Sequence, residues 1–128
     1  MNDTVLYWIE ISDYDFETAL AMQKTGRYLY VGFMCHQTIE KILKGYYRSA
    51  IREIPPYTHS LSRLAQESGL IKELNEEQLR IIDSLNPLNI ASRYPDYKKE
   101  LTDVLNKNRC KELLKNTEDL RQWIKAKL

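Results

Sequence analysis

The sequence contains few of the residues that break regular structure and few that could cross-link the chain. Its 128 residues include only four glycines and four prolines, too few for the many tight turns of a β sandwich or barrel. The two cysteines, Cys35 and Cys110, cannot form the disulfide framework of a small secreted domain. We expect both thiols to be free and to pack in the core, with a disulfide between them as the less favoured alternative.

An excess of charge of one sign and long apolar runs are also absent. The chain has 19 basic and 18 acidic residues, a net charge of +1, which excludes strong attraction to nucleic acid through net charge but not through a local patch. No apolar run approaches the ~18 residues of a membrane span. The first residues, 1–3, lack the basic region of a signal peptide. We therefore expect a cytoplasmic protein without membrane contact.

The composition is that of one globular domain spanning residues 1–128, with 43% hydrophobic and 29% charged residues. A zinc site would have to use the two cysteines with the two histidines, His36 and His59, and their spacing is poor for that purpose. We expect neither a metal site nor a cofactor.

The first segment, Asp3 to Lys24, has the apolar spacing of an amphipathic helix. Asn2 or Asp3 can cap its start, and Gly26 is suited to a left-handed stop just beyond its end. The residues predicted to face the core are Val5, Ile9, Ser12, Phe16, Ala19 and Leu20.

The second segment, Arg27 to Ile51, is apolar around most of its circumference, which predicts a helix at the centre of a bundle. Its polar residues form one narrow stripe because they follow i, i+3, i+4, i+7 spacing. These residues are Gln37, Glu40, Lys41 and Lys44. The stripe is either a solvated strip with an internal Glu40–Lys44 pair or a polar groove whose lysines meet a phosphate or an acidic partner surface.

Prolines and capping residues divide the rest of the chain. The pair Pro55-Pro56 ends the second segment, and a short helix is expected from Thr58, as its cap, to Ser68, before Gly69. Asn75 and Gln78 form a capping pair that predicts a third long helix.

That third helix should continue to about Asn86 and be interrupted at Pro87. We expect an irregular segment over Asn89–Tyr97 and a last helix from Asn106 to Lys127. The fold class is therefore all-α, an up-and-down four-helix bundle with an additional short helix.

Four motifs resemble those of the HEPN family, in the expected order and over essentially the whole chain. They are Trp8 with the stretch Asp13–Leu20; Tyr28, Phe33, Gln37, Glu40-Lys41 and Lys44; Thr58-His59-Ser60-Leu61; and Arg93-Tyr94-Pro95-Asp96. Each motif is weak alone, whereas all four together at these separations are fairly specific.

The resemblance implies a helical bundle that usually dimerises and often acts with a small nucleotidyltransferase, frequently as a toxin–antitoxin or defence module. It also implies a nucleotide or RNA as a candidate ligand. Some members of the family are metal-independent ribonucleases with an Arg followed shortly by a His after the third helix. This chain has no His after Arg93. The pair Arg52 and His59 has similar spacing, but it lies elsewhere and spans Pro55-Pro56, so we interpret it as coincidence.

The predicted nucleotide- or partner-binding residues are Gln37, Glu40, Lys41, Lys44, His59, Arg93, Tyr94 and Asp96. Lysines and Arg93 suit phosphate, Tyr94 suits stacking on a base, and His59 suits a hydrogen bond or proton transfer. Less specific roles remain open, because His59 can simply cap its helix and Arg93 can bridge a loop to helix carbonyls. His36 should face Glu40 one turn away and be structural.

Three functions follow. The leading one is a dimeric HEPN binding module that engages a nucleotidyltransferase, with a nucleotide or RNA as a candidate ligand. The second is a metal-independent endoribonuclease in which His59 is the general acid or base and Arg93 or Arg52 holds the phosphate. The third is a bundle with an assembly role alone. The nine tyrosines and two tryptophans are expected mostly in the core, with some at a dimer interface.

Overall fold

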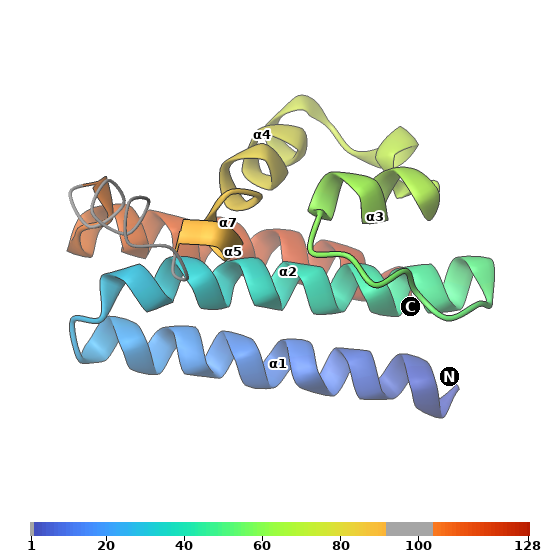
Figure 1. Ribbon diagram of the computed structural model, residues 1–128, viewed down its shortest axis with the longest axis horizontal. Coiled ribbons are helices and arrows are strands. Elements are labelled where there is room, and N and C mark those ends of the chain that lie inside the picture. The colour runs from blue at the N-terminus through green and yellow to red at the C-terminus, as the bar shows by residue number, and fades with distance from the viewer. Residues whose placement is uncertain (1, 92–103) are drawn as a thin grey trace.

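The computed structural model describes residues 2–91 and 104–128, and these residues form helices and their connections without a strand (Figure 1). The elements are α1 (Asp3–Lys24), α2 (Tyr28–Ile51), α3 (Leu61–Glu67), the 3₁₀ helix η1 (Leu70–Glu73), α4 (Glu76–Leu85), α5 (Leu88–Ala91) and α7 (Lys107–Lys125). The prediction of an all-α fold is confirmed. None of the helices within the described ranges is both long and apolar enough to cross a membrane.

Helix α1 begins and ends as its capping residues predict. The Asn2 side chain accepts hydrogen bonds from the backbone N–H groups of Thr4 and Val5, and Gly26 adopts φ 73° after the last turn. Its buried residues are Val5, Ile9, Ser12, Phe16 and Ala19. Leu20, also predicted to face the core, is 45% exposed. The reason is that it lies about 100° around the helix from Ala19, beyond the edge of the buried stripe.

Helix α2 occupies the centre of the bundle, as its apolar circumference predicts. It packs against α1 on one side and α7 on another, and α3 lies on the side opposite α1 (Figure 1). Five of its apolar side chains are completely buried: Val31, Cys35, Ile39, Ile42 and Leu43. Gly45 allows α1 to approach closely, because a Cβ at this position would lie 3.2 Å from the Cβ of Trp8.

Both cysteines are free and buried, as predicted. Burial raises the pKa of Cys35 to about 12 and that of Cys110 to about 11. The two thiols therefore stay protonated at neutral pH and serve as packing groups.

Helix α3 begins three residues later than the sequence suggested. Ser60 is its N-cap, accepting a hydrogen bond from the Arg63 N–H, whereas the hydroxyl of Thr58 accepts one from the Ser60 N–H. Thr58 thus forms a turn before the helix instead of capping it. As a consequence His59 lies in the segment that leads into α3, not in the first turn of the helix.

Helix α4 opens with the predicted capping box between Asn75 and Gln78 and ends before Pro87. The expectation of an irregular segment from Asn89 is wrong for its first residues, since Leu88–Ala91 form the short helix α5. Pro87 directly precedes α5, where a proline with its fixed φ favours the start of a helix. The remainder of that segment lies outside the described residues.

Helix α7 is capped by Asn106, whose side chain accepts a hydrogen bond from the Arg109 N–H. Its buried residues are Cys110, Leu114, Thr117, Leu120, Arg121 and Ile124. Arg121 bonds the carboxylate of Asp13 on α1, so an ion pair adds to the apolar contact between the first and last helices.

Candidate functional site

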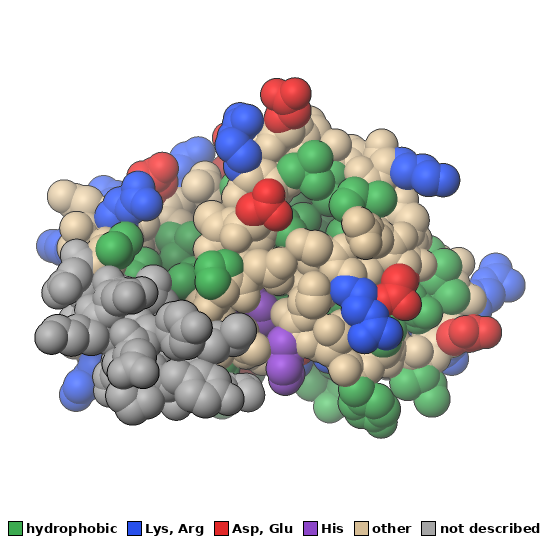
Figure 2. Space-filling view, turned by 45° about the horizontal axis from the view of Figure 1, so that its top comes forward, with side chains coloured by type: hydrophobic (Ala, Val, Ile, Leu, Met, Phe, Trp, Pro, Cys, Tyr) green, Lys and Arg blue, Asp and Glu red, His purple; other side chains and the backbone are tan. Residues whose placement is uncertain are grey.

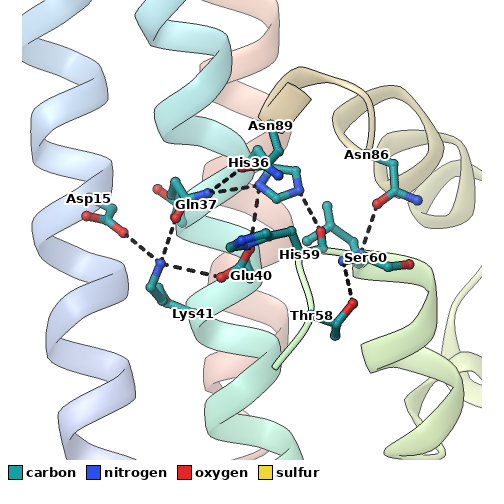
Figure 3. A network of polar contacts seen from close by, with 12 residues as sticks. Asp15, His36, Gln37, Glu40, Lys41, Thr58, His59, Ser60, Asn86 and Asn89 are labelled. Atoms are coloured by element: carbon teal, nitrogen blue, oxygen red, sulfur yellow. Dashed lines mark hydrogen bonds and ion pairs between the residues drawn. The ribbon is translucent and has the colours of Figure 1, made fainter. Parts of the chain in front are cut away.

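A group of polar side chains gathers where α2 passes beneath the segment leading into α3 (Figure 3). We call it the Glu40 cluster. Its members are Asp15, His36, Gln37, Glu40, Lys41, Lys44, His59 and Asn89. They come from α1, α2, the segment before α3, and α5. Elements distant in the sequence therefore contribute to one polar site against an otherwise apolar helix.

Glu40 is the centre of the cluster and is 1% exposed. Its Oε1 atom lies 2.8 Å from His59 Nδ1, while Oε2 lies 3.2 Å from Lys44 Nζ and 3.6 Å from Lys41 Nζ. Burial by itself raises the pKa of this carboxyl, but the His59 hydrogen bond and the two lysine charges together outweigh burial and lower it. Glu40 is therefore ionised at neutral pH.

The contact with Glu40 determines which nitrogen of His59 carries a proton. An ionised carboxylate can only accept hydrogen bonds, so Nδ1 must be the donor. In the neutral ring this leaves a lone pair on Nε2. The side chain of His59 is 52% exposed, and Figure 2 shows histidine atoms at the molecular surface. The His59 ring thus forms a hydrogen bond with a buried carboxylate while about half of its side chain is in contact with solvent.

His36 forms a hydrogen bond with the backbone carbonyl group of His59. Its Nε2 lies 2.9 Å from the His59 carbonyl oxygen and must donate, while Nδ1, 3.3 Å from the Gln37 amide nitrogen, accepts. The ring is completely buried, and burial lowers the pKa of His36 to about 4. As expected, His36 lies one turn from Glu40, with 3.9 Å between Nδ1 and Oε1. It is a neutral, structural histidine.

Lys41 and Gln37 extend the cluster toward α1 and α5. Lys41 Nζ donates to Gln37 Oε1 at 2.8 Å and lies 3.8 Å from Asp15 Oδ2. The Gln37 amide nitrogen then donates to Asn89 Oδ1 at 3.2 Å. Burial raises the pKa of Asp15 even though Lys41 opposes the shift.

The solvated-strip interpretation of the α2 stripe is wrong. Lys44 is only 9% exposed; its Nζ contacts Glu40 and lies 5.6 Å from the centroid of the Trp8 ring, within cation–π range. The predicted Glu40–Lys44 pair is present, but it is buried. Lys41 and Lys44 are both paired with carboxylates. Among the histidines, the lysines and Glu40 of the cluster, His59 has the most exposed side chain.

Three members of the cluster, Asp15, His36 and Asn89, were absent from the predicted site, although His36 was expected to face Glu40. Asp15 lies three residues after Ser12 and four before Ala19, both buried, so its place at the edge of the buried face was a usable signal. Asn89 gave no such signal, since its contact with Gln37 depends on how α5 packs against α2.

The other candidate residues from the sequence are Arg93, Tyr94, Asp96 and Arg52. Arg93, Tyr94 and Asp96 lie outside the described residues. Arg52 is the C-cap of α2, with φ 67°. Its backbone is twelve residues beyond Glu40, about 18 Å along the helix axis. The spacing of Arg52 and His59 therefore does not bring both side chains into the cluster.

Known proteins support this description of the fold. The crystal structure of TT1696 from Thermus thermophilus is similar, with a TM-score of 0.83 over 97% of this chain and 98% of that chain. The two sequences are 20% identical, so this similarity shows a shared fold alone. No curated protein sequence matches the chain.

The family profile described as the HEPN domain matches residues 5–127, nearly the whole chain. That range includes nearly all of the helical residues and every member of the Glu40 cluster. The resemblance seen in the motifs is thereby confirmed, and the chain belongs to the HEPN domain family.

Proposed function

We propose that this chain is a dimeric HEPN binding module that acts with a small nucleotidyltransferase partner, as a toxin–antitoxin or defence module, and contacts a nucleotide or RNA through the Glu40 cluster. Membership of the HEPN family supports the pairing and the dimer, because the family resemblance implies both. The observation that carries the ligand contact is the half-exposed His59 ring, held by the fully buried carboxylate of Glu40 at 2.8 Å.

Buried charges such as those of this arrangement are seldom required for the stability of a fold, which favours a role in binding. Burying a carboxylate is unfavourable even when it is paired, and apolar residues of similar size commonly do as well for stability. Here Glu40 and Lys44 are buried and Lys41 is partly buried around a single half-exposed imidazole. An imidazole at a surface can contact the phosphate, sugar or base of a nucleotide.

The charges of the cluster limit how such a ligand binds. The carboxylates of Asp15 and Glu40 balance the ammonium groups of Lys41 and Lys44, which contact them. Local hydrogen bonds, not bulk attraction, would therefore provide the recognition, and binding would depend only weakly on salt.

Exposed apolar side chains supply surfaces for the dimer and the partner protein. Tyr7 and Tyr14 on α1 are 54% and 71% exposed, and Ile54 and Tyr57, in the segment after α2, are 79% and 99% exposed. Hydrophobic side chains are visible on the same face as the histidine atoms (Figure 2). Aromatic residues of this kind are enriched in protein interfaces.

The ligand contact is tested by fluorescence anisotropy with a labelled single-stranded RNA. The wild-type protein should bind, and His59→Ala should weaken binding about tenfold without loss of the fold. Lys111→Ala, on the exposed side of α7, is the matched control and should bind as the wild type does. Equal binding by His59→Ala and wild type would contradict the proposed contact.

A second function, metal-independent RNA cleavage, is favoured by the same Glu40–His59 hydrogen bond. Nε2 would take the proton of a ribose 2′-hydroxyl, whose oxygen forms a bond to the adjacent phosphorus as the 5′-oxygen leaves and takes a proton from water. The absence of a histidine after Arg93 weighs against it. Cleavage in the presence of a chelator, lost in His59→Ala, would establish this second function.

A further inference from the structure

We propose that His59 accepts a hydrogen bond from a ribose 2′-hydroxyl through Nε2, and that Glu40 is the positioning residue that makes Nε2 an acceptor. The site would then prefer RNA to DNA of the same sequence. This inference rests on the proposed function and specifies the ligand chemistry of the same site.

His59 is held at two points by residues one turn apart on α2. Glu40 Oε1 accepts from the ring Nδ1 at 2.8 Å, and His36 Nε2 donates to the backbone carbonyl at 2.9 Å. Both partners are fully buried. The ring and its backbone are therefore fixed together, although more than half of the side chain is exposed.

The segment after His59 is fixed as well. The Leu61 N–H donates to Asn86 Oδ1 at 2.9 Å, and the Asn86 amide nitrogen donates to the Ser62 hydroxyl at 2.9 Å. Asn86 is the C-cap of α4, so three elements of the bundle determine where the imidazole lies. Such preorganisation reduces the entropy lost when a ligand binds.

The two lysines keep Glu40 in the form that selects the tautomer. Lys44 Nζ lies 3.2 Å and Lys41 Nζ 3.6 Å from Oε2, the oxygen that does not contact His59. A carboxylate paired in this way accepts hydrogen bonds and donates none. The neutral His59 ring is therefore protonated on Nδ1, and its Nε2 can only accept. His36 has the opposite arrangement, with Nε2 as the donor.

An acceptor nitrogen favours a particular kind of ligand group. The oxygens of a phosphodiester carry no proton at neutral pH, so they cannot donate to Nε2, whereas a ribose 2′-hydroxyl can. The 2′-hydroxyl is present in every nucleotide of RNA and is the group by which a protein distinguishes RNA from DNA. A contact through this group requires no particular base.

The tautomer is tested first, without any ligand, by ¹⁵N-detected NMR of the histidine rings at pH 8, where imidazoles are mostly neutral. His59 should show a protonated Nδ1 and a bare Nε2, and His36 the reverse. Glu40→Gln, whose amide nitrogen can donate to Nδ1, should shift His59 toward the Nε2–H tautomer. A predominant Nε2–H tautomer of His59 in the wild type would overturn the inference.

The sugar preference is tested with RNA, DNA and 2′-O-methyl RNA of one sequence, compared by anisotropy at pH 8. The wild type should bind RNA about three- to tenfold more tightly than the other two, the effect of one hydrogen bond. His59→Asn keeps an N–H near the position of Nδ1 but has no group at the position of Nε2. It should lose the preference, so that its affinity for RNA falls to its affinity for DNA.

The outcomes separate the two proposals. The hydroxyl contact would be overturned if the wild type bound RNA and DNA with equal affinity, or if His59→Asn kept the wild-type preference for RNA. The proposed binding of nucleic acid would stand in both cases. The hydroxyl contact would also be overturned if affinity depended on the base sequence and not on the sugar. No binding to any of the three would overturn the proposed function together with this inference. The thermal midpoint of His59→Asn should remain close to that of the wild type.

Discussion

The carboxylate of Glu40 and the imidazole of His59, 19 residues apart in the sequence, form a 2.8 Å hydrogen bond that runs from the fully buried centre of the bundle to its surface. The bond links the central helix to a segment that has no helical structure of its own. Stability, acid response and ligand contact should all depend on it.

Removing the carboxylate should destabilise the protein. Glu40→Ala leaves Lys44 and the His59 N–H without their acceptor, and we expect a loss of roughly 2–4 kcal/mol in the free energy of unfolding, since Lys44 is nearly buried. Chemical denaturation provides the measurement. Glu112→Ala, which removes an exposed carboxylate on α7, is the control and should change stability by no more than about 0.5 kcal/mol. Equal effects of the two substitutions would contradict the structural role of Glu40.

Acid should destabilise the protein through His36. Burial lowers the pKa of this ring to about 4, below the ~6.5 of an unfolded histidine, so the unfolded state binds the proton first. Stability should therefore fall as the pH decreases from about 6.5 toward 4.

The groups around His36 modify this response in both directions. Glu40, whose pKa is lowered, adds stability that is present above its unfolded pKa and lost as the pH falls through its folded pKa. Asp15 on α1 opposes it, because its pKa is raised; its protonation in acid favours the folded state. Lys41 and His59 also face His36 and add positive charge against its protonation.

We expect about 1–2 kcal/mol to be lost between pH 6.5 and 5 by denaturant unfolding, mostly through His36. His36→Gln, whose amide can still donate to the His59 carbonyl, should show a much flatter profile over this range. A wild-type profile as flat as that of the variant would contradict the assignment of a buried neutral His36.

The centre of the bundle should tolerate truncation poorly. Leu43 is completely buried in α2, so Leu43→Ala should cost ~2–5 kcal/mol. Phe33, on the same helix, is only partly buried, and its truncation should cost less. Denaturant midpoints of the two variants provide the comparison. A wild-type midpoint for Leu43→Ala would be incompatible with α2 as the central helix.

The proposed homodimer predicts a species of twice 15.2 kDa in light scattering at micromolar concentration. Tyr14→Glu, at the most exposed aromatic position of α1, should shift the equilibrium toward the monomer if this face is the interface, whereas Tyr57→Glu tests the segment after α2. A wild-type sample containing only the 15.2 kDa species would contradict dimerisation.

Much of the fold could be predicted from the sequence because the signals are local. Asn2, Gly26 and the Asn75–Gln78 pair specify helix ends through contacts within a few residues. The start of α3 was misplaced because Thr58 and Ser60 are both suitable caps, and only the geometry shows that Ser60 accepts the hydrogen bond.

The site was less predictable because its contacts cross elements. The stripe on α2 indicated Glu40 and its lysines, but not that Glu40 and Lys44 are buried. Their burial depends on what packs against them, with His59 against Glu40 and Trp8 of α1 against Lys44. Likewise the bond from His36 to the His59 carbonyl joins residues whose separation of 23 carries no periodic signal. Helical spacing describes one face of one helix and does not indicate what packs against it.

The proposed function depends most on a contact between His59 and a ligand, and an NMR titration of the ¹⁵N-labelled protein with single-stranded RNA tests that contact. The Nε2 resonance of His59 should shift progressively and saturate, while the buried ring nitrogens of His36 change little. Saturable shifts elsewhere with the His59 ring unaffected, or no shift at any RNA concentration, would contradict the proposed contact.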